Sequence, residues 1–390
     1  MSEKIVIVGG GPVGAVLALR LQQQGIAATV LEARASGASH DDKRALALSY
    51  GSRMILEKLG VWDEIEPQAT AINTIHISQR GGLGRTKLNA QDHDLPALGY
   101  VLPYGALTKV LDAKFEQATG LENADIVYEA IALRANSHAA AGEVLFTHAG
   151  KEKTLFSPLL VVADGGNSLE IAGIQRETKE YGHNALVSKV TSELPHNNIA
   201  YERFTPQGPM ALLPNGERQD SKQFSLVWTG EKDAVEALLK LDDATFLAQL
   251  HAAFGDRVGK FLRTEKRMSF PLKLSRLQPS TAPHLVVIGN AAQTMHPVAG
   301  QGFNVGLRDA WTLADLIVSA PELGSESMLK SYSKQRQRDT KGGILFTDFL
   351  VNAFSNDLIG VSALRGAGLG FLGVLKPAKS FLVGKMSHGK

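Results

Sequence analysis

The chain has 390 residues, of which 44% are hydrophobic and 21% charged, an ordinary composition for a globular protein of about two or three domains. Its formal net charge of +2 gives no electrostatic basis for binding nucleic acid, which needs a dense basic face. The absence of cysteine excludes disulfides, thiolate metal sites and a cysteine nucleophile. No run approaches the roughly 18 uninterrupted apolar residues of a spanning helix, and the first apolar run lacks the features of a signal peptide. We therefore expect a cytoplasmic protein.

The N-terminal residues predict a βαβ unit. Residues 3–8 form a short apolar, β-branched run that is typical of a buried strand. Pro12 suits the first turn of a helix and Gly25 suits its C-terminal end, and a second strand is expected over 27–33. Because strand, glycine turn, helix and strand follow one another so closely, we expect a parallel α/β sheet.

Glycines occupy three positions after the first strand, in the pattern Gly9-x-Gly11-x-x-Gly14. Gly9 allows a tight turn, Gly11 lets a pyrophosphate approach the backbone, and Gly14 lets the helix pack closely on the strand. A diphosphate would then lie at the helix N-terminus, where free N–H groups favour anions. Glu32 ends the second strand, 18 residues beyond Gly14, and can accept hydrogen bonds from ribose hydroxyls. This context predicts a dinucleotide site.

The middle of the chain favours a different architecture. Five short runs with turn residues between them are typical of a mostly antiparallel sheet with one face toward solvent or ligand: 72–78, 184–192, 199–205, 210–216 and 223–229. The pattern of a buried strand followed by glycine returns at 158–168 and 282–292. The α/β domain is therefore expected to be discontinuous, with the β-rich region inserted into it.

A dense glycine motif follows late in the chain, in "GNAAQTMHPVAGQGFN". A strand is expected to end at Gly289, Pro297 fixes a turn, and Gly300, Gln301 and Gly302 lead into a helix through about residue 318. Such an arrangement directs helix N–H groups at a flat, electron-accepting ring. Negative charge on the reduced form of that ring would be stabilised there.

A third motif, Asp164-Gly165, follows another expected strand, and it suits either a plain turn or a cofactor contact. Together the three motifs resemble the single-component FAD-dependent aromatic hydroxylases, which share the fold of p-hydroxybenzoate hydroxylase. The segments "AYERFTPQGPMALLP" and "SLVWT" are similar to the ubiquinone-biosynthesis hydroxylases, and most closely to the 2-polyprenyl-6-methoxyphenol hydroxylases. The resemblance runs over nearly the whole chain.

The resemblance implies an α/β fold. A discontinuous, Rossmann-like FAD-binding domain would carry an inserted, mostly antiparallel β-sheet substrate domain and a C-terminal helical segment. The expected boundaries are 1–71, 98–175 and 274–340 for the FAD-binding domain, 72–97 and 176–273 for the substrate domain, and 341–390 for the C-terminal helical segment.

The resemblance also implies the cofactor-binding residues. These are Gly9, Gly11, Pro12, Gly14, Glu32, Arg44, Asp164, Gly165, Asn290, Pro297, Gly300, Gln301, Gly302 and Asn304. Arg44 would approach the diphosphate and Glu32 the adenosine ribose, while the late motif would approach the ribityl chain and the pyrimidine edge of the flavin. Most family members carry Asp where Asn290 stands, and the amide keeps an acceptor while adding donors.

The activity implied is that of an FAD-dependent monooxygenase. It would use NAD(P)H and dioxygen, through a flavin hydroperoxide, to hydroxylate a polyprenylated methoxyphenol in ubiquinone biosynthesis. Its partners would be the polyprenyl phenol, dioxygen and other quinone-biosynthesis proteins. Three alternatives stay open: another ring hydroxylase of the quinone pathway, a flavin reductase or dehydrogenase of the same fold, and a non-catalytic FAD-binding component of a quinone-synthesis assembly.

Few other residues point to catalysis. His296 is weighed as a general base against a local hydrogen-bonding or steric role, and no other catalytic residue is assigned. Glu202 and Arg203 are expected on one strand as a solvated or cross-strand pair. Four other histidines lack ligand spacing with carboxylates, so no metal site is expected: His76, His93, His183 and His196.

The last stretch, 358–390, contains five basic and no acidic residues among apolar side chains. This composition suits an amphipathic helix on an anionic membrane surface. It suits equally a helix that docks on the protein's own core. On the first reading the protein would be peripheral on the inner face of the membrane.

Overall fold

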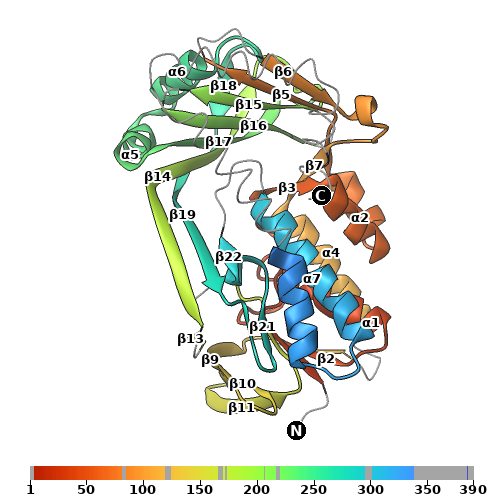
Figure 1. The fold of residues 1–390 in the computed structure, drawn as a ribbon. Coiled ribbons are helices and arrows are strands. Elements are labelled where there is room, and N and C mark those ends of the chain that lie inside the picture. Colours follow the sequence, from red (N-terminus) through yellow and green to blue (C-terminus); the bar gives the residue numbers. More distant parts are fainter. Residues whose placement is uncertain are drawn as a thin grey trace.

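The structure is a computed structural model that describes residues 4–80, 85–118, 124–165, 170–171, 174–205, 207–216, 220–294 and 301–337, together with Gly384. Two bodies lie one above the other in Figure 1, and two long strands connect them, β14 (Gln175–Ser192) and β19 (Met268–Gln278). The lower body contains the N-terminal βαβ unit and the upper body contains a large, mostly antiparallel sheet.

The lower body is built on a six-stranded sheet in the order β20-β21-β12-β1-β2-β8. Its strands are β1 (Ile5–Val8), β2 (Ala28–Leu31), β8 (Ala124–Val127), β12 (Leu160–Val162), β20 (Thr281–Ala282) and β21 (Leu285–Val287). All neighbours pair in parallel except β20 with β21. Because β1 is covered on both faces, all four of its residues are apolar and buried.

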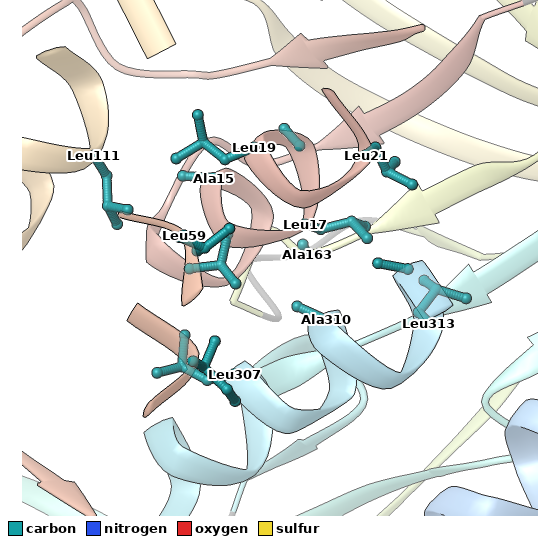
Figure 2. Close-up of a cluster of buried hydrophobic side chains, with 14 of the residues drawn as sticks. Ala15, Leu17, Leu19, Leu21, Leu59, Leu111, Ala163, Leu307, Ala310 and Leu313 are labelled. Carbon is teal, nitrogen blue, oxygen red and sulfur yellow. The ribbon is translucent and has the colours of Figure 1, made fainter. Parts of the chain in front are cut away.

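Helices cover this sheet. They are α1 (Pro12–Gln23), α2 (Tyr50–Lys58), α3 (Trp62–Ile65), α4 (Tyr104–Ala118) and α7 (Gln301–Ser319). Figure 2 shows Leu17 and Leu21 of α1 near Leu313 of α7, and all three are fully buried. Burying each such leucine contributes about 1.5–3 kcal/mol. Where the two helices meet, a Cβ on Gly306 would lie 2.9 Å from a methyl of Val13, so the close packing requires glycine.

The upper body is a nine-stranded sheet with the path β22-β19-β14-β17-β16-β15-β5-β6 and with β18 paired to β14. Its further strands are β5 (Thr74–Gln79), β6 (Arg85–Asn89), β15 (Ile199–Thr205), β16 (Gly208–Asn215), β17 (Gln223–Glu231), β18 (Phe261–Thr264) and β22 (Gln293–Thr294). Only β15 and β5 pair in parallel among these neighbours.

The two faces of the large sheet meet different partners. Helices α5 (Lys232–Lys240) and α6 (Asp243–Phe254) cover one face, where Phe246 packs in a core with Trp228 and Leu226. The opposite face meets a three-stranded sheet of β3 (Ala45–Ser49), β7 (Gly99–Pro103) and β4 (Thr70–Ile72). There Ala200 and Ile75 of the large sheet share a core with Val101 of β7. This second face therefore looks toward the lower body (Figure 1).

A four-stranded sheet closes the end of the lower body. It consists of β9 (Ile131–Ser137), β10 (Gly142–His148), β11 (Lys151–Ser157) and β13 (Glu170–Ile171). Three short 3-10 helices complete the described elements: η1 (Glu66–Gln68), η2 (Ala90–His93) and η3 (Gly289–Ala291).

The expected α/β fold class with an inserted antiparallel sheet is confirmed, and the expected helix through about residue 318 ends at Ser319. The domain division stays a prediction. Two of its expected boundaries, at 175/176 and 273/274, fall within the long strands that connect the two bodies, because β14 begins at Gln175 and β19 contains residue 274. The expected helical segment at 341–390 lies outside the described residues apart from Gly384. In the described part of the chain, no helix is long and apolar enough to cross a membrane.

Candidate FAD site

The N-terminal glycine motif forms the turn between β1 and α1. Gly9 has a positive φ of 102°, and a Cβ there would lie 2.7 Å from the carbonyl oxygen of Ala163. A Cβ on Gly14 would lie only 1.9 Å from the carbonyl oxygen of Gly9. Gly11, in contrast, is extended and a Cβ there would meet only side-chain ends, at 3.8 and 3.9 Å. Gly9 and Gly14 thus serve the fold, while Gly11 leaves open space before the helix.

A cavity of about 540 Å³ begins at this turn and reaches the start of α7. Nine of the predicted site residues line it: Gly9, Gly11, Pro12, Glu32, Arg44, Asp164, Gly165, Asn290 and Gly302. The cavity therefore brings together the three motifs, which lie more than a hundred residues apart in sequence. Gly14 was also predicted to bind the cofactor, but it lies outside the lining because it packs against the backbone of Gly9.

Glu32 is held in place before any ribose arrives. Its Oε2 accepts from the amide of Gly10 at 2.7 Å, and its Oε1 accepts from Nε of Arg34 at 2.7 Å. Burial opposes the charged form of this carboxyl, but the hydrogen bonds and charge of Arg34 outweigh it, so the pKa of Glu32 lies below its ordinary value. Glu32 is therefore an ionised acceptor on the wall of the cavity.

Arg44 lies on the same wall, next to Arg34 and Tyr104. Its guanidinium lies over the Tyr104 ring, 5.2 Å from the centroid, and Nε donates to Oδ2 of Asp42 at 2.8 Å. The hydrogen bond to Asp42 is the main reason that the pKa of Arg44 is raised. Two guanidinium groups, each held by a neighbouring carboxylate, thus place positive charge near the N-terminal end of α1, where it favours a diphosphate.

The late motif approaches the first one directly. The N–H of Gly289, which has φ +63°, donates to the buried Asp309 carboxylate of α7 at 3.0 Å. Asn290 is exposed to the cavity, and a Cβ on Gly302 would lie 3.5 Å from its Oδ1. The first turn of α7 and the Asn290 amide therefore form the far end of the cavity from Glu32.

Asn304 occupies a different environment from the one predicted. Its Oδ1 accepts from the backbone N–H of Ser49 at 2.8 Å and from the Ser52 hydroxyl at 2.7 Å. Its Nδ2 donates to the carbonyl oxygen of Ala47 at 2.9 Å. The side chain is 2% exposed and fixes α7 to β3 and α2 rather than lining the cavity.

Part of the late motif lies outside the described residues. This applies to His296, Pro297 and Gly300, and to the side chain of Gln301, whose backbone begins α7. Their predicted roles stay predictions. Within the described ranges, no group of three His, Asp or Glu residues could hold a metal ion.

Sequence reasoning missed Arg34 and Tyr104, which both line the cavity. The spacing of Glu32 and Arg34 offered a signal, because residues two apart at the end of a strand point to the same side. Tyr104 had no such signal, since it comes from the start of α4, far along the chain. Its phenol and the Arg34 guanidinium are the side-chain ends nearest to the open space at Gly11.

The residues present fit an FAD molecule. A ribose acceptor, two guanidinium groups, a helix N-terminus that Gly11 leaves accessible, and a polar far end follow each other along one elongated cavity. The cavity volume lies within the range of ordinary cofactor sites. The donor set matches the sequence of ribose, diphosphate and ribityl groups in a flavin dinucleotide.

The model of the FAD binding domain family matches residues 2–343. The chain belongs to this family. It is 33% identical over 387 residues to the ubiquinone hydroxylase UbiL of Rhodospirillum rubrum, with 96% of this chain and 87% of the relative covered. It is 31% identical over 376 residues to the 3-demethoxyubiquinol 3-hydroxylase of Escherichia coli, with 94% and 93% covered. The expected resemblance to ubiquinone-biosynthesis FAD hydroxylases and the expected FAD cofactor are confirmed.

Solved structures agree with this assignment at the level of the fold. The p-nitrophenol 4-monooxygenase PnpA of Pseudomonas putida superposes with a TM-score of 0.80 at 16% identity, covering 99% of this chain and 98% of that one. PqsL of Pseudomonas aeruginosa, a probable FAD-dependent monooxygenase, superposes with a TM-score of 0.74 at 19% identity. These two structures show the fold alone, while the family match and the two relatives above 30% identity make the protein an FAD-dependent monooxygenase of the aromatic hydroxylase type.

Proposed function

We propose that this protein hydroxylates a polyprenylated methoxyphenol in ubiquinone biosynthesis, using FAD, NAD(P)H and dioxygen. The observation that carries the proposal is the single cavity that joins the three sequence motifs. Two relatives above 30% identity that act in ubiquinone hydroxylation support the choice of pathway. The substrate ring and prenyl tail follow from the segments that resemble the methoxyphenol subgroup.

Different residues of the cavity would bind different parts of the cofactor. Glu32 would bind the adenosine ribose, and Arg44 with Arg34 and the N-terminus of α1 would hold the diphosphate. Asn290 would bind the ribityl chain. The positive end of the α7 dipole lies at the far end of the cavity and would stabilise negative charge there.

Bound FAD supplies the oxygen-activating chemistry, which no amino-acid side chain provides. The protein must then orient the phenol and exclude water from the reacting atoms. The large sheet is suited to this because its face toward the lower body carries apolar residues such as Ile77, Leu213 and Val227. NAD(P)H would bind transiently on another surface, since the βαβ motif is used for FAD.

Labelled dioxygen tests the proposal. FAD-loaded protein is incubated with NADPH, a short-chain 2-prenyl-6-methoxyphenol and isotopically labelled dioxygen, and the product is analysed by mass spectrometry. We expect a product with one added oxygen atom that carries the label, and none when NADPH is left out. A reduced or dehydrogenated product without label would instead identify a flavin reductase or dehydrogenase.

A further inference from the structure

Glu202 and Arg203 are neighbours on β15, but they point to opposite faces of the large sheet, as successive strand residues must. Arg203 lies under α6, where Nε donates to the carbonyl oxygen of Ala253 at 3.3 Å and Nη1 to the Ser78 hydroxyl at 3.3 Å. Glu202 is therefore on the face that α5 and α6 leave uncovered. The expectation of a solvated or cross-strand pair is wrong, because strand alternation puts the two side chains on opposite faces of the sheet and neither is exposed.

An apolar row surrounds Glu202 on that face. Glu202 pairs in register with Ala211 of β16 on one side and with Ile77 of β5 on the other. Beyond Ala211 the row continues through Val227 of β17 and Val187 of β14. The half-buried Glu202 carboxyl is thus flanked by aliphatic side chains, and this apolar environment disfavours its ionised form.

This face is the one that meets the FAD-binding body. The adjacent row contains Ala200 and Ile75, which share a core with Ala45 of β3 and Val101 of β7. The residue before Ala45 is Arg44, which lines the FAD cavity. Figure 1 shows the same relation, with α6 above the large sheet and β3 and β7 below it, toward the lower body. Glu202 therefore faces the side from which a substrate would meet the flavin.

Burial alone governs the charge state of the Glu202 carboxyl. Burial raises the pKa of its carboxyl to about 7, and no described residue donates a hydrogen bond to it or forms an ion pair with it. Along the paired rows on its face, β5, β6, β16 and β17 present no charged side chain beside it. Lys189 of β14, which pairs with Ser225, is a charged residue of the neighbouring row and lies three strands away from β15.

We propose that the Glu202 carboxylate binds the ring hydroxyl of the phenolic substrate and takes up its proton, an inference that rests on the proposed function. A phenol that enters an apolar site needs an acceptor for its O–H group, and Glu202 is an acceptor whose capacity the described residues do not use. A carboxyl that titrates near neutral pH is well matched to the task of a general base.

The proton balance is simple. As the ring carbon forms its bond to the oxygen atom, the phenol O–H bond breaks and its proton moves to the Glu202 carboxylate. The oxygen atom would come from dioxygen activated at bound FAD: the O–O bond breaks, the second oxygen atom leaves as water, and NAD(P)H supplies the two electrons. When aromaticity is restored, the attacked carbon loses its proton to solvent. The original ring oxygen then takes its proton back from Glu202. The carboxylate is regenerated, so the residue acts in each turnover.

The test compares wild type with Glu202→Gln, which keeps shape and removes charge. The matched control is Glu231→Gln, at an exposed glutamate that ends β17 of the same sheet. The affinities of oxidised, FAD-loaded protein for a short-chain 2-prenyl-6-methoxyphenol and for its O-methyl ether are measured by flavin fluorescence at pH values below and above 7. Because the ether cannot donate a hydrogen bond, the ratio of the two affinities isolates the ring hydroxyl.

We expect wild type and Glu231→Gln to prefer the phenol by about tenfold or more above pH 7, the value for a hydrogen bond to a charged group. The preference should shrink as pH falls and Glu202 becomes protonated, and Glu202→Gln should show a small, pH-independent preference. The rate of hydroxylation should likewise lose its rise through pH 7 in this variant. An affinity ratio unchanged by Glu202→Gln would overturn the inference alone. Wild type that binds neither compound would overturn the proposed function, and this inference with it.

Discussion

Nε of Arg34 lies 2.7 Å from Oε1 of Glu32, and this ion pair fixes the carboxylate on the wall of the FAD cavity. The other oxygen of Glu32 accepts from the Gly10 amide at 2.7 Å. The turn of the glycine motif and the ribose acceptor are thus one hydrogen-bonded unit. Arg34, two positions after Glu32, thus fixes the orientation of the Glu32 carboxylate.

Replacing Glu32 should therefore weaken FAD binding. Glu32→Gln removes the charge from the ribose acceptor, and hydrogen bonds to charged groups are each worth about 1.5–3 kcal/mol, so affinity should fall by about 10- to 100-fold. Flavin fluorescence titration of the apoprotein measures this. Glu57→Gln, at the exposed partner of Arg53, is the control and should bind FAD as wild type does. Equal affinities for both variants would show that Glu32 does not contact the cofactor.

The glycine motif offers a second test, which separates folding from binding. Gly14→Ala places a Cβ 1.9 Å from a backbone oxygen, so α1 must shift and stability should fall by about 3 kcal/mol or more. Gly11→Ala meets only side-chain ends and should fold normally, yet its methyl should lower FAD affinity by blocking the approach of the diphosphate. Urea unfolding and FAD titration measure the two effects. Normal FAD affinity in Gly11→Ala would contradict the assigned position of the diphosphate.

The interior of the FAD-binding body contains a charged pair, Asp309 and Arg336, at 2% and 7% exposure. Nε of Arg336 lies 2.5 Å from Oδ1 of Asp309. Asp309→Asn leaves the guanidinium buried without its counter-charge, and removing one partner of a buried pair costs about 3–5 kcal/mol. Asp315→Asn breaks the pair with Arg20 on the solvent side of α7 and should cost less than about 1 kcal/mol. Urea unfolding measures both losses of stability. Similar losses for Asp309→Asn and Asp315→Asn would contradict the greater importance of the buried pair.

The pKa of Glu202 predicts a pH dependence of stability. Burial raises this pKa from its ordinary 4.5 to about 7, so the folded protein must hold a desolvated charge once the pH exceeds about 7. Stability contributed by the neutral form is complete below about pH 4.5 and is lost as the pH rises to about 7. Glu202→Gln should therefore match wild type near pH 4.5 and be more stable above pH 7, by urea unfolding. If the difference in stability between Glu202→Gln and wild type did not vary with pH, the Glu202 carboxyl would be solvated by water and not buried.

Local patterns predicted much of the cofactor site. Gly9, Gly11, Gly14 and Glu32 belong to one βαβ unit, and their geometry follows from the strand, turn and helix that adjoin them. The position of Asn304 could not be predicted from local patterns in this way. Its position in a motif suggested a cofactor contact, but its amide satisfies the backbone of β3 instead. That outcome depends on which segment packs against α7, which spacing along the chain does not determine.

The substrate side was harder to predict. The strand that contains Glu202 was expected at 199–205 and is observed there as β15. Strand alternation separates Glu202 from Arg203, but the sequence does not state which face α6 covers. The assignment of Glu202 to the substrate side required the register with Ala211 and Ile77.

The most direct test of the central claim is the rate of FAD reduction without oxygen. Bleaching of the bound flavin by NADPH is followed by stopped-flow absorbance, with and without a short-chain 2-prenyl-6-methoxyphenol. A hydroxylase of this phenol should be reduced much faster when the phenol is bound. Reduction at the same rate with and without the phenol would contradict the proposed substrate, and a protein that takes up no FAD would contradict the site itself.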